Sequence, residues 1–248
     1  MDNQQVQVIK SDGVVRIQLN RPEKKNAFTQ AMYSSCQQAL LDADNDDQVS
    51  VVLFESAGDS FSAGNDLNDF LAIDNLDETA PPFKFLHTLN SVTVPIVAKV
   101  NGLAIGIGTT LLLHCDLVYA SEDAIFALPF VKLGLLPEAG SSLLLPRLCG
   151  HQLASELLLL GDNFSAQKAQ QLGFVNDVVA SGELDQRVEQ TLQVLTQQSR
   201  QALRVSKTLI KAPQQTVADR ISHEAGYFAK ALSSEDAKRA IAAKLKKK

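Results

Sequence analysis

The 248-residue sequence predicts an α/β fold, and three features of its hydrophobic pattern indicate this. Over the first half, runs typical of strands alternate with segments of helical period. Two of these runs, residues 49–54 and 94–100, are apolar without alternation, which is typical of strands covered on both faces. From about Ala139 onward the period is helical almost throughout. No linker rich in Gly, Ser or Pro separates the two parts, so we expect one structural unit with a helical appendage.

The elements of the first half follow in order. Alternating apolar residues predict strands over 6–8 and 14–19, joined by a Ser-Asp-Gly turn. Thr29 is expected to cap a helix, and the apolar residues on one face of this helix are Met32, Cys36 and Leu40. The two buried strands come next, with a helix expected from about Gly106 to His114. Further strands are predicted over 117–120 and 124–127.

The second half is predicted to be helical. One helix ends at Gly161, and Ser165 caps another that ends at Gly173. Later helices are expected over residues 183–200, 201–211 and 217–232, with a last one capped by Ser233 or Ser234.

Composition excludes several classes of protein. A net charge of -5 and a pI near 5.4 argue against a nucleic-acid binder, which needs a basic face. The start lacks the apolar core of a signal peptide, and no apolar run reaches the ~20 residues that span a bilayer. Three scattered cysteines (Cys36, Cys115, Cys149) and four separated histidines predict neither disulfides nor a metal site. We therefore expect a soluble protein of the reducing cytoplasm, without membrane or metal.

Familiar nucleotide and hydrolase motifs are also missing. The glycine-rich stretch 102–108 has Leu111 where a dinucleotide fingerprint needs Gly, and it lacks the Lys of a P-loop. There is no Gly-x-Ser-x-Gly elbow, so Ser141 and Ser142 are interpreted as a helix start.

Two glycine-rich segments, residues 61–67 and 101–108, each follow a buried strand and precede a helix start. Their free N–H groups could converge on one carbonyl oxygen and form an oxyanion hole. They could equally be two ordinary strand-to-helix turns, and spacing alone does not choose between these interpretations.

Five motifs together resemble the crotonase family, also called the enoyl-CoA hydratase/isomerase superfamily. They are Asn-Arg-Pro-Glu-Lys-Lys-Asn-Ala (20–27), Phe-Ser-Ala-Gly-Asn-Asp-Leu (61–67), Pro-Ile-Val-Ala-Lys-Val-Asn-Gly (95–102), Cys-Asp-Leu-Val-Tyr-Ala (115–120) and Leu-Pro-Arg-Leu (145–148). The resemblance implies a crotonase-like spiral of ββα units over residues 1–190, with an acyl-CoA site. It implies a C-terminal helical trimerisation region over 191–248, and thus a homo-oligomer, either a trimer or a dimer of trimers.

The resemblance also implies roles for single residues. The backbone N–H groups of Asn65 and Ile107 correspond to the oxyanion hole. The residues that would contact CoA or the acyl chain are Lys24, Asn26, Ala27, Ala63, Gly64, Asp66, Leu67, Gly106 and Phe130. The Asp- and Pro-rich segment 70–85 is expected to be a loop in the wall of the acyl pocket.

The carboxylates separate the branches of this family. Family hydratases have glutamates where this sequence has Thr110 and Phe130, and neither of these can activate water. Glu138, in Pro-Glu-Ala-Gly-Ser-Ser, instead resembles the base of the Δ3,Δ2-enoyl-CoA isomerase branch. Taken without the resemblance, Glu138 is more simply a carboxylate that favours a helix N-terminus.

The resemblance therefore implies an isomerase of fatty-acid β-oxidation that converts 3-enoyl-CoA to trans-2-enoyl-CoA. Glu138 would be its single base, and apolar residues around it (Phe130, Leu135, Leu136, Leu143) would raise its pKa. No cofactor is expected, because CoA is part of the substrate. Alternatives are hydration, ring-opening isomerisation of aromatic-derived CoA esters, and non-catalytic acyl-CoA binding.

Overall fold

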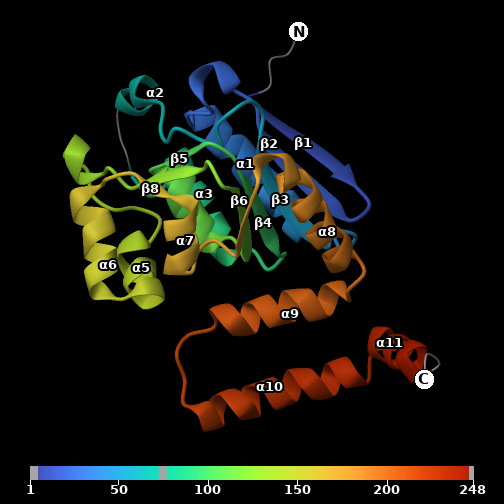
Figure 1. Cartoon of the computed structure of the whole chain (residues 1–248). Coiled ribbons are helices and arrows are strands. Elements are labelled where there is room, and N and C mark those ends of the chain that lie inside the picture. Colours follow the sequence, from blue (N-terminus) through green and yellow to red (C-terminus); the bar gives the residue numbers. More distant parts are fainter. Residues whose placement is uncertain (1–4, 73–76, 246–248) are drawn as a thin grey trace.

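The computed structural model describes residues 5–72 and 77–245 (Figure 1). Its main sheet has the strand order β1-β2-β3-β4-β6-β9, and β1 is the one strand of this sheet that runs antiparallel to its neighbour. The strands are β1 (Val6–Ser11), β2 (Val14–Leu19), β3 (Val51–Ser56), β4 (Ile96–Val100), β6 (Leu117–Ser121) and β9 (Asp177–Val179). The α/β class predicted from the sequence is confirmed.

A second, smaller sheet lies beside the first. It consists of β5 (Leu103–Ile105), β7 (Ile125–Ala127) and β8 (Phe164–Ser165). The prediction of an almost entirely helical second half is wrong at β8 and β9. These strands have two and three residues, too few for any hydrophobic period to show in the sequence.

Helices cover both faces of the main sheet, as the two apolar strands predict. On one face Val52 and Phe54 pack with residues of α1 (Gln30–Asp44) and α3 (Pro81–Ser91). On the other face Val51 and Leu53 pack against α8 (Leu184–Thr196). All four side chains are fully buried, so alternate residues of one strand serve two hydrophobic cores.

Several short helices complete the body. They are α2 (Leu67–Leu71), α4 (Ile107–Thr110), α5 (Ser141–Cys149), α6 (His151–Ser155) and α7 (Ala166–Leu172). The predicted caps are confirmed, since Thr29 accepts from the N–H of Met32 and Ser165 from that of Lys168. The helix predicted from Gly106 to His114 is α4 followed by a 3-10 turn, Leu111–His114.

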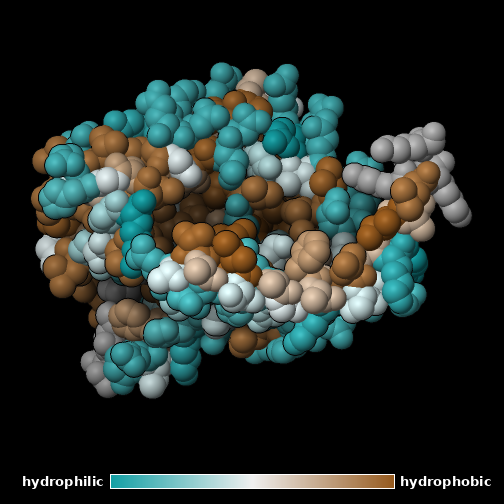
Figure 2. All heavy atoms as spheres, turned by 90° about the horizontal axis from the view of Figure 1, so that it is seen from below, coloured by the Kyte–Doolittle hydropathy of each residue, from teal (hydrophilic) through white to brown (hydrophobic). Residues whose placement is uncertain are grey.

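Three C-terminal helices, α9 (Arg200–Lys211), α10 (Val217–Leu232) and α11 (Glu235–Leu245), lie below the body in Figure 1. Position 190, the predicted end of the core, falls inside α8, which packs on the sheet through Leu192. Seen from below, where these helices are nearest, hydrophobic side chains gather beside a central hollow (Figure 2). Among the described residues, no helix combines the length and apolar character needed to cross a bilayer.

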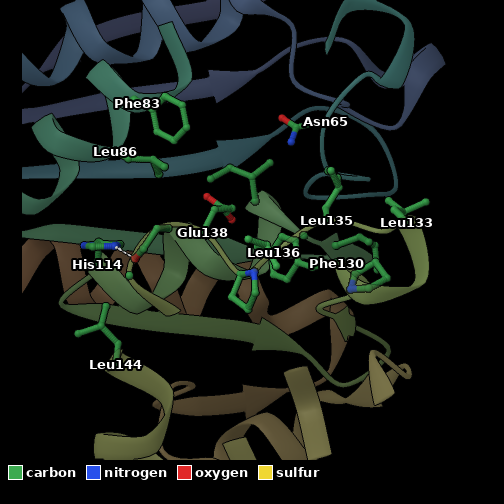
Figure 3. A pocket seen from close by; sticks show the side chains of 18 of the residues that line it. Asn65, Phe83, Leu86, His114, Phe130, Leu133, Leu135, Leu136, Glu138 and Leu144 are labelled. Atoms are coloured by element: carbon green, nitrogen blue, oxygen red, sulfur yellow. Dashed lines mark hydrogen bonds between the residues drawn. The ribbon is translucent and has the colours of Figure 1, made fainter. Parts of the chain in front are cut away.

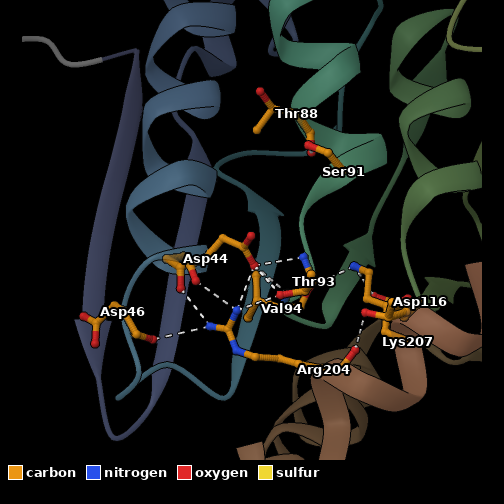
Figure 4. A network of polar contacts seen from close by, with 11 residues as sticks. Asp44, Asp46, Thr88, Ser91, Thr93, Val94, Asp116, Arg204 and Lys207 are labelled. Atoms are coloured by element: carbon orange, nitrogen blue, oxygen red, sulfur yellow. Dashed lines mark hydrogen bonds and ion pairs between the residues drawn. The ribbon is translucent and has the colours of Figure 1, made fainter. Parts of the chain in front are cut away.

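An ion pair between a buried lysine and a partly exposed aspartate fixes α9 to the body (Figure 4). The Lys207 ammonium lies 2.7 Å from the Asp116 carboxylate and donates to the carbonyl of Val94 at 2.8 Å. Asp116, just before β6, also accepts from the N–H of Ile96 at the start of β4. Lys207 is 3 % exposed, so the pair is a contact between α9 and the sheet.

Arg204, one turn earlier on α9, makes a second anchor. Its guanidinium lies 2.8 Å from the carboxylate of Asp44 at the end of α1, and it also donates to the hydroxyl of Thr93. Asp44 in turn accepts from the N–H groups of Thr93 and Val94. Together the two anchors hold the start of the C-terminal helices against the ends of α1 and β4.

Candidate active site

A cavity of about 900 Å³ lies between α3, the two glycine-rich segments and the loop that carries Glu138 (Figure 3). Most of its lining is apolar, and Glu138 is the one carboxylate among the described residues that line it. Asn65 and Glu138 face the cavity from opposite sides in Figure 3.

The backbone brings the two glycine-rich segments together. The N–H of Ser62 donates to the carbonyl of Leu103 at 2.8 Å, and the N–H of Ile105 donates back to the carbonyl of Ser62 at 2.9 Å. A Cβ atom on Gly108 would lie 2.8 Å from the Ser62 oxygen, which is closer than such atoms approach in proteins. Glycine therefore permits the close contact on which the shape of this wall depends.

Two backbone N–H groups in this wall are free to bind a ligand. Asn65 and Ile107 both line the cavity, and in the described part of the chain neither main-chain N–H donates to an acceptor. Ile107 is the first residue of α4, so its N–H has no partner within the helix. Its side chain is buried in the hydrophobic core, which leaves the amide at the cavity wall. Two free donors on one cavity wall are what an oxyanion hole requires.

Tyr33 fixes the segment that carries Asn65. Its hydroxyl donates to the side-chain carbonyl of Asn65, and its ring packs 4.9 Å from Phe28 and 5.5 Å from Phe85. Burial raises the pKa of Tyr33 well above its ordinary value, so the phenol keeps its proton and remains a donor.

The chain turns sharply at Glu138. Ala139 and Gly140 both have left-handed backbone, with φ of +53° and +67°, and the N–H of Ser141 closes the turn on the Glu138 carbonyl at 2.9 Å. The His114 ring nitrogen Nε2 donates to the carbonyl of Ala139 at 2.8 Å. Desolvation lowers the pKa of His114, so the ring is neutral and carries its hydrogen on Nε2. This bond fixes the turn that aims Glu138 into the cavity.

Desolvation raises the pKa of Glu138 to about 7, as its apolar surroundings predict. A hydrogen bond from the Thr110 hydroxyl to the Glu138 carboxylate opposes this rise. A carboxyl group with this pKa is present in both protonation states near neutral pH. It can therefore take a proton from a ligand and give one back.

The predicted acyl and CoA residues fall into two groups. Those that line the cavity are Ala63, Gly64, Leu67, Gly106 and Phe130. Lys24, Asn26, Ala27 and Asp66 do not line it, although the loop of the first three is tied to the wall because the N–H of Ala63 donates to the Lys25 carbonyl. Asp66 is paired with Arg21 at 2.8 Å and accepts from the N–H groups of Asn68 and Asp69 in α2.

The position of Asn26 argues against the expected direct contact with CoA. Its side chain is fully buried, accepts from the N–H of Arg21 and donates to the carbonyls of Ala57 and Ser60. In this structure Asn26 therefore shapes the loop from within.

Sequence reasoning placed segment 70–85 in the cavity wall but missed the helix α3 that begins in it. Phe83, within that segment, and Leu86, just after it, both line the cavity from α3. Pro81 and Pro82 occupy the first positions of this helix, where proline is favoured, and this signal could have revealed it. Residues 73–76 of the same segment lie outside the described residues.

The expected apolar residues surround Glu138, but part of this wall is open to solvent. Leu135, Leu136 and Leu143 all line the cavity, and the Leu136 residue is 81 % exposed. A bound acyl chain or a covering surface would therefore complete the exclusion of water.

The sequence profile of the enoyl-CoA hydratase/isomerase family matches residues 9–248. The chain belongs to the enoyl-CoA hydratase/isomerase family. A solved enoyl-CoA hydratase/isomerase of Pseudoalteromonas atlantica T6c is 36 % identical, with a TM-score of 0.81 over 98 % of both chains. The crotonase fold expected from the resemblance is thus supported for the body of the chain.

The relatives that resemble this chain include proteins named as isomerases and proteins named as hydratases. Enoyl-CoA delta isomerase 2 of Rattus norvegicus is 39 % identical over 82 % of this chain, which spans 54 % of that relative's length. The 2,3-dehydroadipyl-CoA hydratase of Escherichia coli K12 is 34 % identical over 97 % of this chain and 95 % of its own. Family membership therefore implies an acyl-CoA substrate, and the residues in the cavity must decide the reaction.

Proposed function

We propose that this chain is a Δ3,Δ2-enoyl-CoA isomerase that uses Glu138 as its single acid–base group. The observation that supports this most directly is the presence of one carboxylate, with a pKa of about 7, in a largely apolar cavity that also exposes two free N–H groups. Isomerisation needs one group that removes a proton and returns it. Hydration needs a bound and activated water, for which family hydratases use two glutamates.

The proposed reaction begins with the thioester oxygen at the N–H groups of Asn65 and Ile107. The Glu138 carboxylate removes a proton from C2, and the electron pair of the broken C–H bond forms the C1–C2 double bond of an enolate. The two N–H groups stabilise the negative charge on its oxygen.

In the second half the enolate collapses and a C2–C3 double bond forms. The electron pair of the former C3–C4 double bond takes the proton back from Glu138 at C4, which restores the carboxylate. The two steps together add and remove no atoms and no electrons, so the reaction as written uses neither water nor a redox partner. CoA enters and leaves as part of the substrate.

Thr110 and Phe130 stand where the family hydratases have glutamates, and this disfavours hydration. Phe130 is buried, and the Thr110 hydroxyl already donates to Glu138. The likeness to the E. coli hydratase keeps hydration as the second candidate reaction.

We also propose that the chain works as a homo-oligomer, a trimer or a dimer of trimers. No residue of α10 is buried, and its exposed apolar side chains recur at helical spacing along one face. They are Val217, Ile221, Phe228 and Leu232. A second copy of the chain is the partner that the family resemblance implies for this face.

Product identity tests the proposed reaction. Purified protein is supplied with 3-hexenoyl-CoA. The products are separated by chromatography and their masses are measured by mass spectrometry. We expect 2-hexenoyl-CoA, which has the mass of the substrate. A chain that leaves 3-hexenoyl-CoA unchanged but converts 2-hexenoyl-CoA to a product heavier by one water would be a hydratase instead, and no turnover of either ester would favour a binding protein.

A further inference from the structure

Thr110 reaches two acceptors with one hydroxyl group. It is fully buried on α4, donates to Oε1 of Glu138, and lies 3.3 Å from the carbonyl oxygen of Gly106. A hydroxyl has one hydrogen and two lone pairs, so it donates to one of these oxygens at a time and can accept from a third group.

Two other polar side chains near Glu138 have partners already. The Tyr33 hydroxyl donates to Asn65, and the Nε2 hydrogen of His114 is bound to Ala139. His87 lines the same cavity from α3. Among the described residues, the Thr110 hydroxyl is the group that donates to the Glu138 carboxylate.

We propose that Thr110 is a positioning residue whose hydroxyl holds Glu138 in one place through both of its protonation states. This inference rests on the proposed function. It adds to that function the contact that keeps the Glu138 carboxyl group in position between the two proton transfers.

Each state has a complete set of bonds. While Glu138 is ionised, the Thr110 hydroxyl donates to it. When Glu138 has taken the proton from C2 on its other oxygen, the Thr110 hydroxyl continues to donate to Oε1, which is then the carbonyl oxygen of the carboxylic acid. Return of the proton to C4 leaves this bond in place. No covalent bond of Thr110 changes, and the carboxyl group need not move to find a partner.

Two substitutions isolate the hydroxyl. Thr110→Val keeps the branched shape and removes the hydroxyl, whereas Thr110→Ser keeps the hydroxyl. The protonation of Glu138 is followed by NMR in protein labelled with ¹³C at the glutamate carboxyl, where the signal missing from Glu138→Gln identifies it. The rate of isomerisation of 3-hexenoyl-CoA is measured across the same pH range.

We expect Glu138 of the unmodified chain to titrate near pH 7. In Thr110→Val, which no longer stabilises the carboxylate, we expect the midpoint to rise by about one unit or more. Its kcat should fall about 10–100-fold, with little change in KM, even at a pH where Glu138 is fully ionised. Thr110→Ser should restore both quantities.

A titration midpoint and kcat in Thr110→Val equal to those of the unmodified chain would overturn the inference. A Thr110→Ser protein as impaired as Thr110→Val would overturn it as well, because the methyl group would then be the important part. These results leave the proposed function intact as long as Glu138→Gln is inactive. The proposed function itself fails if Glu138→Gln isomerises normally.

Discussion

Glu138→Gln is expected to lower kcat for the isomerisation of 3-hexenoyl-CoA by about 10²–10⁴-fold, the contribution typical of a positioned acid–base group. Glutamine keeps the size and the hydrogen-bonding capacity of the side chain but cannot accept a proton from C2. KM should change little, since the cavity wall and the two N–H groups remain. The measurement is a steady-state rate assay on the purified variant.

An exposed acid supplies the control for that substitution. Glu122 lies in a surface turn outside the cavity, and Glu122→Gln should retain the full rate. If Glu138→Gln and Glu122→Gln were equally active, Glu138 would not be the base.

Asp116→Ala is expected to lower the free energy of unfolding by about 2 kcal/mol, less than the loss of ~3–5 kcal/mol typical of a fully buried pair, because the Asp116 side chain is 27 % exposed. The variant leaves the buried Lys207 ammonium with the Val94 carbonyl as its remaining partner. It also removes the acceptor for the N–H of Ile96. Urea unfolding at one fixed protein concentration measures the loss.

Asp185→Ala provides a matched comparison for this loss. Asp185 also pairs with a lysine, Lys99 at 2.8 Å, but its side chain is 82 % exposed. Removing it should cost at most about 1 kcal/mol, because solvent screens such pairs. Equal losses in the two variants would show that the contact of α9 with the sheet does not depend on the pair of Lys207 with Asp116.

The sequence was sufficient for the features that depend on long, regular patterns. The runs at 49–54 and 94–100 became β3 and β4 because each strand contributes to a core on both sides. Thr29 and Ser165 could be identified as caps because the cap acts on backbone N–H groups two or three residues away. The surroundings of Glu138 and the direction of its pKa shift also followed from nearby apolar residues.

Contacts between distant parts of the chain could not be foreseen in this way. Nothing local in the sequence shows that the Thr110 hydroxyl meets Glu138, or that His114 meets Ala139, 25 residues later. Asn26 was expected to contact CoA because of its place in a motif, whereas the fold buries it under carbonyls from residues 57 and 60. Short strands such as β9 depend on their neighbours in the sheet rather than on their own pattern.

The fate of the proton removed from C2 tests the single-base account most directly. A 3-hexenoyl-CoA with two deuterium atoms at C2 is isomerised in ordinary water, and the product is analysed by NMR and mass spectrometry. If Glu138 carries the deuteron from C2 to C4 within a shielded cavity, part of the product will hold one deuterium at C2 and one at C4. A product with deuterium at C2 and none at C4 would mean that the proton at C4 comes from water or a second acid, and would contradict direct transfer by a shielded Glu138.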